Sequence, residues 1–147
     1  DVGSSFLSSD INAAVLFSQI ENIEDIQNQR VKIWNRYFLG LKNLEEEGLL
    51  HLPRIPHYAN INGHLFFLEC DSAKTRDLLI RYLNQRGIQA VFHYLPLHQS
   101  PYFRDKHDGR ILKNTVRFSE RIVRLPLYYE LSEDDQDYII ESIQKFF

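Results

Sequence analysis

The stretch Leu65-Phe66-Phe67-Leu68, inside a segment that runs from His64 to Cys70, decides the fold class of this 147-residue chain. Four consecutive large apolar residues are typical of a β-strand that is buried on both of its faces. A strand of that kind needs helices to cover it. We therefore expect an α/β fold in which helices pack on a small sheet.

The segment that follows this strand predicts a helix and a second strand. Its apolar residues are spaced as on one face of a helix, which Gly87 ends: Leu78, Leu79, Tyr82 and Leu83. Residues from Ile88 to Tyr94 then have the composition of a strand.

The last third of the chain predicts an irregular segment, a strand and a helix. Residues 99–115 carry polar turn residues and are expected to be irregular. Ile122 to Leu125 form a short third strand. Ser132 and Asp135 approximate a capping box, which marks the start of a helix that reaches Phe146.

Upstream of the buried strand, the apolar spacing predicts helix from Ser9 to about Glu46, as one helix or as two with a kink near Asn22. Gly48 ends this helical segment. We expect residues 1–48 to be a helical arm that leads to a large domain outside this chain, and residues 49–147 to be a small α/β domain. The absence of methionine favours a piece of a longer protein.

Composition excludes several classes of protein. Seventeen Lys and Arg against 20 Asp and Glu give a formal charge of −3, which offers no basic field for nucleic acid or an anionic membrane. No apolar run approaches the roughly 20 residues of a membrane-spanning helix. The single cysteine, Cys70, excludes an internal disulfide and fits a reducing, cytoplasmic compartment.

Metal and nucleophile chemistry find little support in the sequence. Of six histidines, His93 and His98 are the nearest pair, but Pro96 lies between them and no Cys pair accompanies them, so no metal site is expected. Cys70 ends an apolar strand, where a buried and inert thiol is the default.

Two short stretches could bind a ligand. Gly3-Ser4-Ser5 is a small hydroxyl-bearing turn before a helix, and it either binds phosphate or merely caps the helix. Phe92 to His98 place two imidazoles and a phenol at a turn that a proline stiffens. This corner either holds a phosphorylated or hydroxylated ligand or presents ordinary solvent-facing aromatic residues.

These stretches resemble the DegT/DnrJ/EryC1/StrS family of sugar aminotransferases, and the resemblance covers the whole chain. The matching segments, in the family's order, are Gly3 to Ala14, Arg86-Gly87-Ile88, His93 to His98, Ser119-Glu120-Arg121 and Leu125-Pro126-Leu127. Ser4, Ser5 and Leu7 depart from the Tyr, Asn and Arg that are usual in the first of these segments.

The resemblance implies the C-terminal small domain of the aspartate-aminotransferase (type I) fold, with a long helical arm and a small, mainly antiparallel sheet. Such enzymes are homodimers that use pyridoxal 5′-phosphate (PLP) to move an amino group from L-glutamate to a nucleotide-linked 4-keto-6-deoxy sugar. It also implies that Ser4 and Ser5 contact the cofactor, and that His93, Tyr94 and His98 contact the substrate.

The resemblance implies no catalytic residue in this chain, because the family's Schiff-base lysine lies upstream of the matched segments. The chain has six lysines, all on polar helix faces or in a loop: Lys32, Lys42, Lys74, Lys106, Lys113 and Lys145. We therefore expect the chain alone to be inactive. The alternative interpretation is a non-enzymatic α/β module for dimerisation or regulation.

Overall fold

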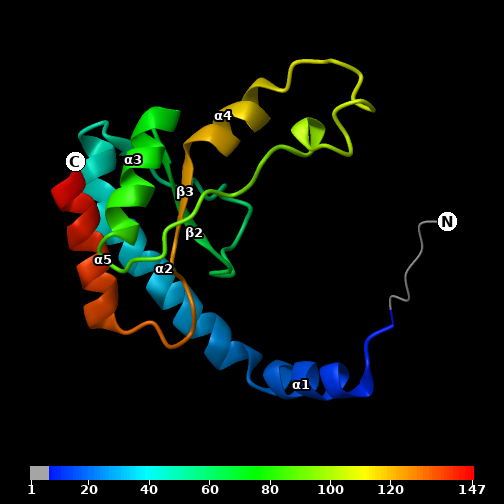
Figure 1. The fold of residues 1–147 in the computed structure, drawn as a ribbon. Helices are drawn as coiled ribbons and strands as arrows, with labels where there is room; N and C mark the ends of the chain where they lie inside the picture. Colours follow the sequence, from blue (N-terminus) through cyan, green and yellow to red (C-terminus); the bar gives the residue numbers. More distant parts are fainter. Residues whose placement is uncertain (1–6) are drawn as a thin grey trace.

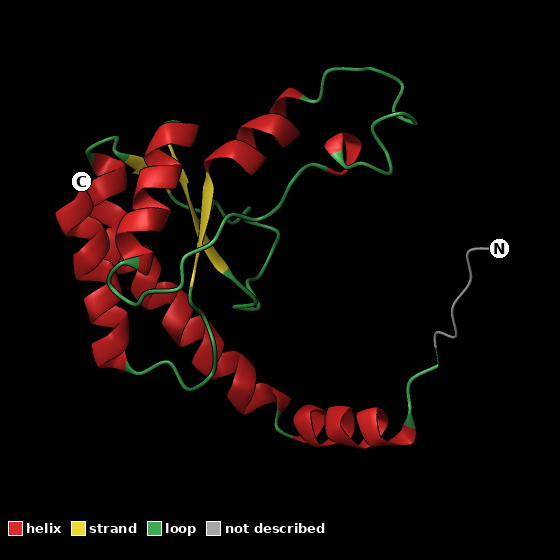
Figure 2. Ribbon diagram, in the orientation of Figure 1, coloured by secondary structure: helices red, strands yellow, loops and turns green. Residues whose placement is uncertain are grey.

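The computed structural model describes residues 7–147, which form five α-helices, three strands and one 3-10 turn (Figure 2). In chain order these are α1 (Asp10–Glu21), α2 (Ile23–Glu46), β1 (Leu50–His51), β2 (Phe66–Cys70), α3 (Ala73–Asn84), η1 (Leu97–Gln99), α4 (Lys113–Arg121), β3 (Ile122–Leu125) and α5 (Glu133–Phe146). In the part of the chain described, no helix combines the length and the apolar character that crossing a membrane requires.

The sheet is antiparallel throughout, with strand order β1-β2-β3. Leu50 pairs with Cys70 at one edge of β2, and Phe66 pairs with Leu125 at the other. Alternate residues of a strand face opposite sides of the sheet. On β2 both sides are covered, since Leu68 and Glu69 are both buried. The prediction of a strand buried on both faces is therefore confirmed.

Helix α2 supplies one wall of the core. Ile33, Tyr37, Leu41 and Leu44, spaced four, four and three residues apart, are buried together with Trp34. The rings of Trp34 and Tyr37 lie 5.3 and 5.1 Å from the ring of Phe66 in β2, centroid to centroid. Helices α3 and α5 join α2 in one layer against the sheet (Figures 1 and 2).

The loop between β1 and β2 is fastened to α2 at Gly63. Arg30 donates hydrogen bonds from Nε and Nη2 to the carbonyls of Gly63 and His64, at 3.0 and 2.7 Å. Gly63 has φ +60°, and a Cβ there would lie 2.6 Å from the backbone carbon of Arg30. Only glycine fits this position without a shift of the backbone.

The N-terminal helical segment is two helices, which settles the alternative left open by the sequence. The break falls at Asn22, whose φ of −111° is not helical. Helix α1 leads away from the body of the fold (Figure 1) and buries none of its residues, although it carries Ile11, Val15 and Phe17. The sequence analysis expected this helical segment to end at Gly48. Gly48 does follow the end of α2, and its φ of +74° is the left-handed conformation that often ends a helix.

The prediction of a strand from Ile88 to Tyr94 was wrong. Only Val91 pairs with β3, through two hydrogen bonds with Arg124. The chain turns tightly just before it, because the Ala90 N–H donates to the Ile88 carbonyl at 2.9 Å. The third strand of the sheet is instead β1, in the segment after Gly48, which the sequence analysis did not assign to a strand.

The expected irregular excursion over residues 99–115 is present except at its end. Turns follow η1, and α4 begins at Lys113. The sequence analysis did not predict helix α4, because most of its residues are polar and none of them is fully buried. The helix predicted to follow Ser132 is α5, and the Ser132 hydroxyl accepts from the Asp135 N–H at 3.1 Å.

A matched pair of leucines on α2 tests this packing. Leu41 is 0% exposed and Leu39 is 70% exposed. We expect Leu41→Ala to lower the free energy of unfolding by about 2–5 kcal/mol, because it removes apolar contacts and leaves a cavity. Leu39→Ala should cost less than about 0.5 kcal/mol. Equal losses in chemical denaturation followed by circular dichroism would contradict this placement of α2.

Candidate functional site

The predicted substrate corner runs from the β3 edge of the sheet outward. Val91 is held to Arg124 by backbone hydrogen bonds of 3.2 and 2.8 Å, and the chain then continues through His93 and Pro96 to η1. The corner therefore begins at a defined position on the sheet and leaves it as a loop that ends in α4.

His93 is partly buried beside Arg124 of β3. The Arg124 Nη1 lies 3.2 Å from the His93 Nδ1, and because a guanidinium can only donate, Nδ1 accepts. Burial, then the positive charge of Arg124, lower the pKa of His93 below its ordinary value. The imidazole is therefore neutral at neutral pH, with its proton on Nε2, and it can donate one hydrogen bond to a ligand.

Tyr94 stands next to His93 and is 64% exposed. The two rings are tilted against each other, with centroids 3.8 Å apart. The pair offers an imidazole N–H and a phenol on one exposed edge of the corner. Such groups can bind a hydroxylated ligand through hydrogen bonds.

His98 belongs to a different group of side chains. Its ring lies 5.0 Å from that of His107, centroid to centroid, and both line a pocket of about 380 Å³. The structure thus brings His93 together with Tyr94, and His98 together with His107. The sequence analysis singled out His98 but not His107, because nothing in the spacing of the residues indicates that the loop folds back on η1.

Ser4 and Ser5, the residues predicted to contact the cofactor, lie outside the described residues. Ser9, which is described, caps α1: its hydroxyl accepts from the Asn12 N–H at 3.3 Å.

An ion pair that the sequence analysis missed anchors α4 to the sheet. The Arg117 Nε and Nη2 donate to the two carboxylate oxygens of Glu69, at 2.6 and 2.8 Å. Glu69 sits in β2 and is only 4% exposed. The hydrogen bonds from Arg117 hold the pKa of this carboxyl below its ordinary value, against the opposing effect of burial. A glutamate inside an apolar strand segment was the one signal that could have indicated this pair.

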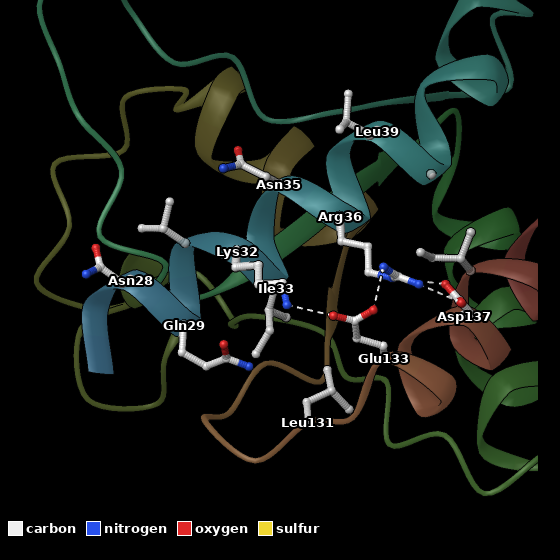
Figure 3. A pocket seen from close by; sticks show the side chains of 13 residues that line it. Asn28, Gln29, Lys32, Ile33, Asn35, Arg36, Leu39, Leu131, Glu133 and Asp137 are labelled. Carbon is white, nitrogen blue, oxygen red and sulfur yellow. Dashed lines mark hydrogen bonds and ion pairs between the residues drawn. The ribbon is translucent and has the colours of Figure 1, made fainter. Parts of the chain in front are cut away.

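A groove of about 810 Å³ lies elsewhere, between α2 and α5 (Figure 3). Its charged groups already satisfy one another: Arg36 bonds Asp137 at 2.6 and 3.0 Å, and Glu133 accepts from Lys32 and Arg36. These pairs hold the two helices together, and none of the predicted site residues lines the groove.

Nucleophile and metal chemistry have no centre in the described part of the chain. Cys70 is fully buried, and burial raises the pKa of its thiol to about 12, as expected for an inert core cysteine. Among residues 7–147, no three His, Cys, Asp or Glu side chains converge as a metal site would require.

Comparison with known proteins agrees with this geometry. The model of the DegT/DnrJ/EryC1/StrS aminotransferase family matches residues 2–144. The chain therefore belongs to this family. The predicted fold class is confirmed: an α/β unit with a small antiparallel sheet, of the kind found in the PLP-dependent aminotransferases of this family.

Three solved structures illustrate the similarity. The aminotransferase TlmJ of Streptoalloteichus hindustanus shares 25% identity over 99% of this chain, with a TM-score of 0.85. A family member from Brucella abortus shares 31% over 91%, with a TM-score of 0.77. NtdA of Bacillus subtilis, solved with bound pyridoxamine phosphate, shares 25% over 82%, with a TM-score of 0.71. The chain spans 38%, 34% and 28% of those proteins, respectively.

The residues described here do not form a PLP site by themselves. A Schiff base needs a lysine amine held in an enclosed site, whereas all six lysines of this chain are exposed. Lys32, Lys42 and Lys145 pair with glutamates, and Lys106 lies over the ring of Tyr102. No step that involves the cofactor can be assigned to these side chains.

The Glu69–Arg117 pair makes stability depend on pH. Because the folded-state pKa of Glu69 is lowered, its contribution is present above the ordinary glutamate value of 4.5 and is lost as pH falls below it. We expect Glu69→Gln to flatten this acid-side loss, measured as the denaturation midpoint against pH. Glu120→Gln, at an exposed glutamate of α4, is the control and should keep the wild-type slope. Identical slopes in all three proteins would contradict the assignment.

The thiol of Cys70 provides a second test. Because burial leaves it protonated and out of reach, an aromatic disulfide reagent at about pH 8 should not react with the folded chain. The same reagent should modify one thiol per chain once denaturant is added. Rapid reaction before unfolding would show that β2 is not covered as described.

Proposed function

We propose that this chain is the C-terminal portion of a PLP-dependent nucleotide-sugar aminotransferase. Residues 1–48 form the arm that leads to a large domain bearing the Schiff-base lysine, and residues 49–147 form the small domain. The match of the family over residues 2–144 carries this proposal. It is further supported by the bound pyridoxamine phosphate of the NtdA structure, which is a form of the cofactor that carries an amino group.

The complete protein transfers an amino group from L-glutamate to C4 of dTDP-4-keto-6-deoxyglucose. We infer this substrate from a resemblance in sequence: the segments at Ser4 to Leu7 and at Phe92 to His98 resemble those of the dTDP-4-amino-4,6-dideoxygalactose transaminase of enterobacterial common antigen synthesis. That assignment places the protein in the cytoplasm, in the synthesis of lipopolysaccharide-type sugars.

Within this proposal the site residues bind and orient; none moves a proton. Ser4 and Ser5 contact the cofactor phosphate of the partner subunit. His93 donates its Nε2 proton to a sugar oxygen, which its neutral state allows, and Tyr94 extends the same edge. His98 contacts the nucleotide-sugar from the pocket that it shares with His107.

The proposal includes a homodimer, and α1 supports it. Helix α1 buries none of its residues and exposes large apolar side chains on several sides: Ile11, Val15, Leu16, Phe17 and Ile20. Apolar surface of this extent is covered in a stable protein. The large domain together with the second subunit would cover it.

The experiment compares the complete protein, with its upstream coding sequence joined in frame, with the 147-residue chain. We expect the complete protein to aminate dTDP-4-keto-6-deoxyglucose in the presence of glutamate, followed by mass spectrometry of the product. The 147-residue chain alone should show no turnover, because it supplies no enclosed lysine. His98→Ala in the complete protein should lower kcat/KM by about tenfold, as the loss of a substrate hydrogen bond does.

Two outcomes would contradict the proposal. A complete protein that binds neither PLP nor dTDP would leave the alternative, a module for dimerisation or regulation. A change in kcat/KM within about twofold for His98→Ala would remove this residue from the substrate site.

A further inference from the structure

Helix α4 joins the sheet to the loop that carries His98. Its last residue, Arg121, is followed directly by Ile122, the first residue of β3, and its other end continues from the loop (Figure 1). Within the described chain, no hydrogen bond or ion pair connects residues 94–111 with another segment; those that they make are internal. The position of this loop therefore depends on its two attachments, Val91 on β3 at one end and α4 at the other.

One pair of side chains fixes α4 to the sheet. The guanidinium of Arg117 donates two hydrogen bonds to the Glu69 carboxylate of β2, at 2.6 and 2.8 Å. Among the described residues, no other side chain of α4 makes a hydrogen bond or ion pair with another helix or strand. Apolar anchoring is weak, because α4 buries no residue fully and Phe118 is 40% exposed. The direction in which α4 leaves the sheet thus depends on the contact between Arg117 and Glu69.

The place of Glu69 in the sheet makes this contact an effective brace. Glu69 is the register partner of Ile122, so its carboxylate lies beside the junction between α4 and β3. Arg117 reaches it from the middle of the helix. The 9 residues of α4 span about 13 Å, so a tilt of about 10° at the junction would move the far end by about 2 Å. The start of the helix and the loop attached to it would move together.

The two groups have the chemistry of a geometric constraint. An arginine fork meets a carboxylate in one plane through two hydrogen bonds, whereas a lysine ammonium binds it as a point charge without a fixed direction. The attraction between buried charges is largely offset by the cost of removing them from water. The main effect of the Arg117–Glu69 pair is therefore to orient α4, rather than to add net stability.

We propose that Arg117 is a positioning residue for the substrate: together with Glu69 it fixes the tilt of α4, and thereby the place at which the loop holds His98. Arg117 acts through His98 and not by contact with the substrate. That His98 contacts a nucleotide-sugar rests on the proposed function. That the pair fixes the loop rests on the contacts of the described chain alone, so the two are tested by separate measurements.

The first test is backbone amide relaxation by NMR in the 147-residue chain with Arg117→Lys. Lysine keeps a positive charge beside Glu69, so the chain remains folded, but it removes the fork. We expect the order parameters of residues 97–112 to fall below about 0.6, the range of flexible backbone, while those of β2 and β3 keep their wild-type values. Lys113→Gln is the matched control, because Lys113 is a basic residue of the same helix without an ion pair in the described chain. It should leave all these order parameters unchanged.

The second test is the steady-state kinetics of the complete protein. Arg117→Lys should raise KM for the nucleotide-sugar by about tenfold and leave kcat within about twofold, because a misplaced binding contact weakens the ground state and the transition state alike. KM for glutamate should also stay within about twofold, which a general loss of structure would not predict. His98→Ala added to Arg117→Lys should cost less than a further factor of about two, since both changes remove the same contact.

Four outcomes would overturn the proposal. The first is unchanged relaxation of residues 97–112 in Arg117→Lys, and the second is an equal effect of Lys113→Gln. The third is a mobile loop with an unchanged KM for the nucleotide-sugar. The fourth is full additivity of Arg117→Lys and His98→Ala, which would exclude an effect through His98. A complete protein without aminotransferase activity would overturn the proposed function instead, and the relaxation measurement would still decide whether the pair fixes the loop.

Discussion

The contact between α2 and the central strand β2 is the constraint on which the rest of the structure depends. Phe66 packs against Trp34 and Tyr37, and the Tyr37 hydroxyl donates to the Pro126 carbonyl at 2.9 Å. This one aromatic cluster therefore ties α2 to β2 and to the residue that follows β3. Since β2 pairs with both other strands, the position of the whole sheet follows from it.

The position of the candidate site depends on the same sheet, through strand β3. Pairing of β3 with β2 places Arg124 where it can bond Val91 and His93, which fixes the beginning of the corner. On the same face of the sheet as the Arg124 side chain, the buried Glu69 holds Arg117 of α4. The loop that carries His98 and His107 is thus tethered at both of its ends to β2 and β3. Side chains on a loop can form a site only when its ends are held in this way.

The helices of the described chain differ in whether other parts of the chain cover their apolar side chains. Helices α2, α3 and α5 bury their apolar faces against the sheet and against one another, and ion pairs between α2 and α5 close the outer edge (Figure 3). Helix α1 has no such cover.

Local patterns in the sequence were enough to predict the α/β class, the buried strand at β2, the ends of α2 and α5 and the inert Cys70, because these follow from runs of apolar residues and from caps. The sequence also indicated the family. It could not show that Ile88 to Tyr94 leaves the sheet after Val91, since a tight turn and a strand share the same apolar alternation. The Glu69–Arg117 pair and the meeting of His98 with His107 join residues far apart or folded back in a loop, and only the tertiary structure decides such contacts.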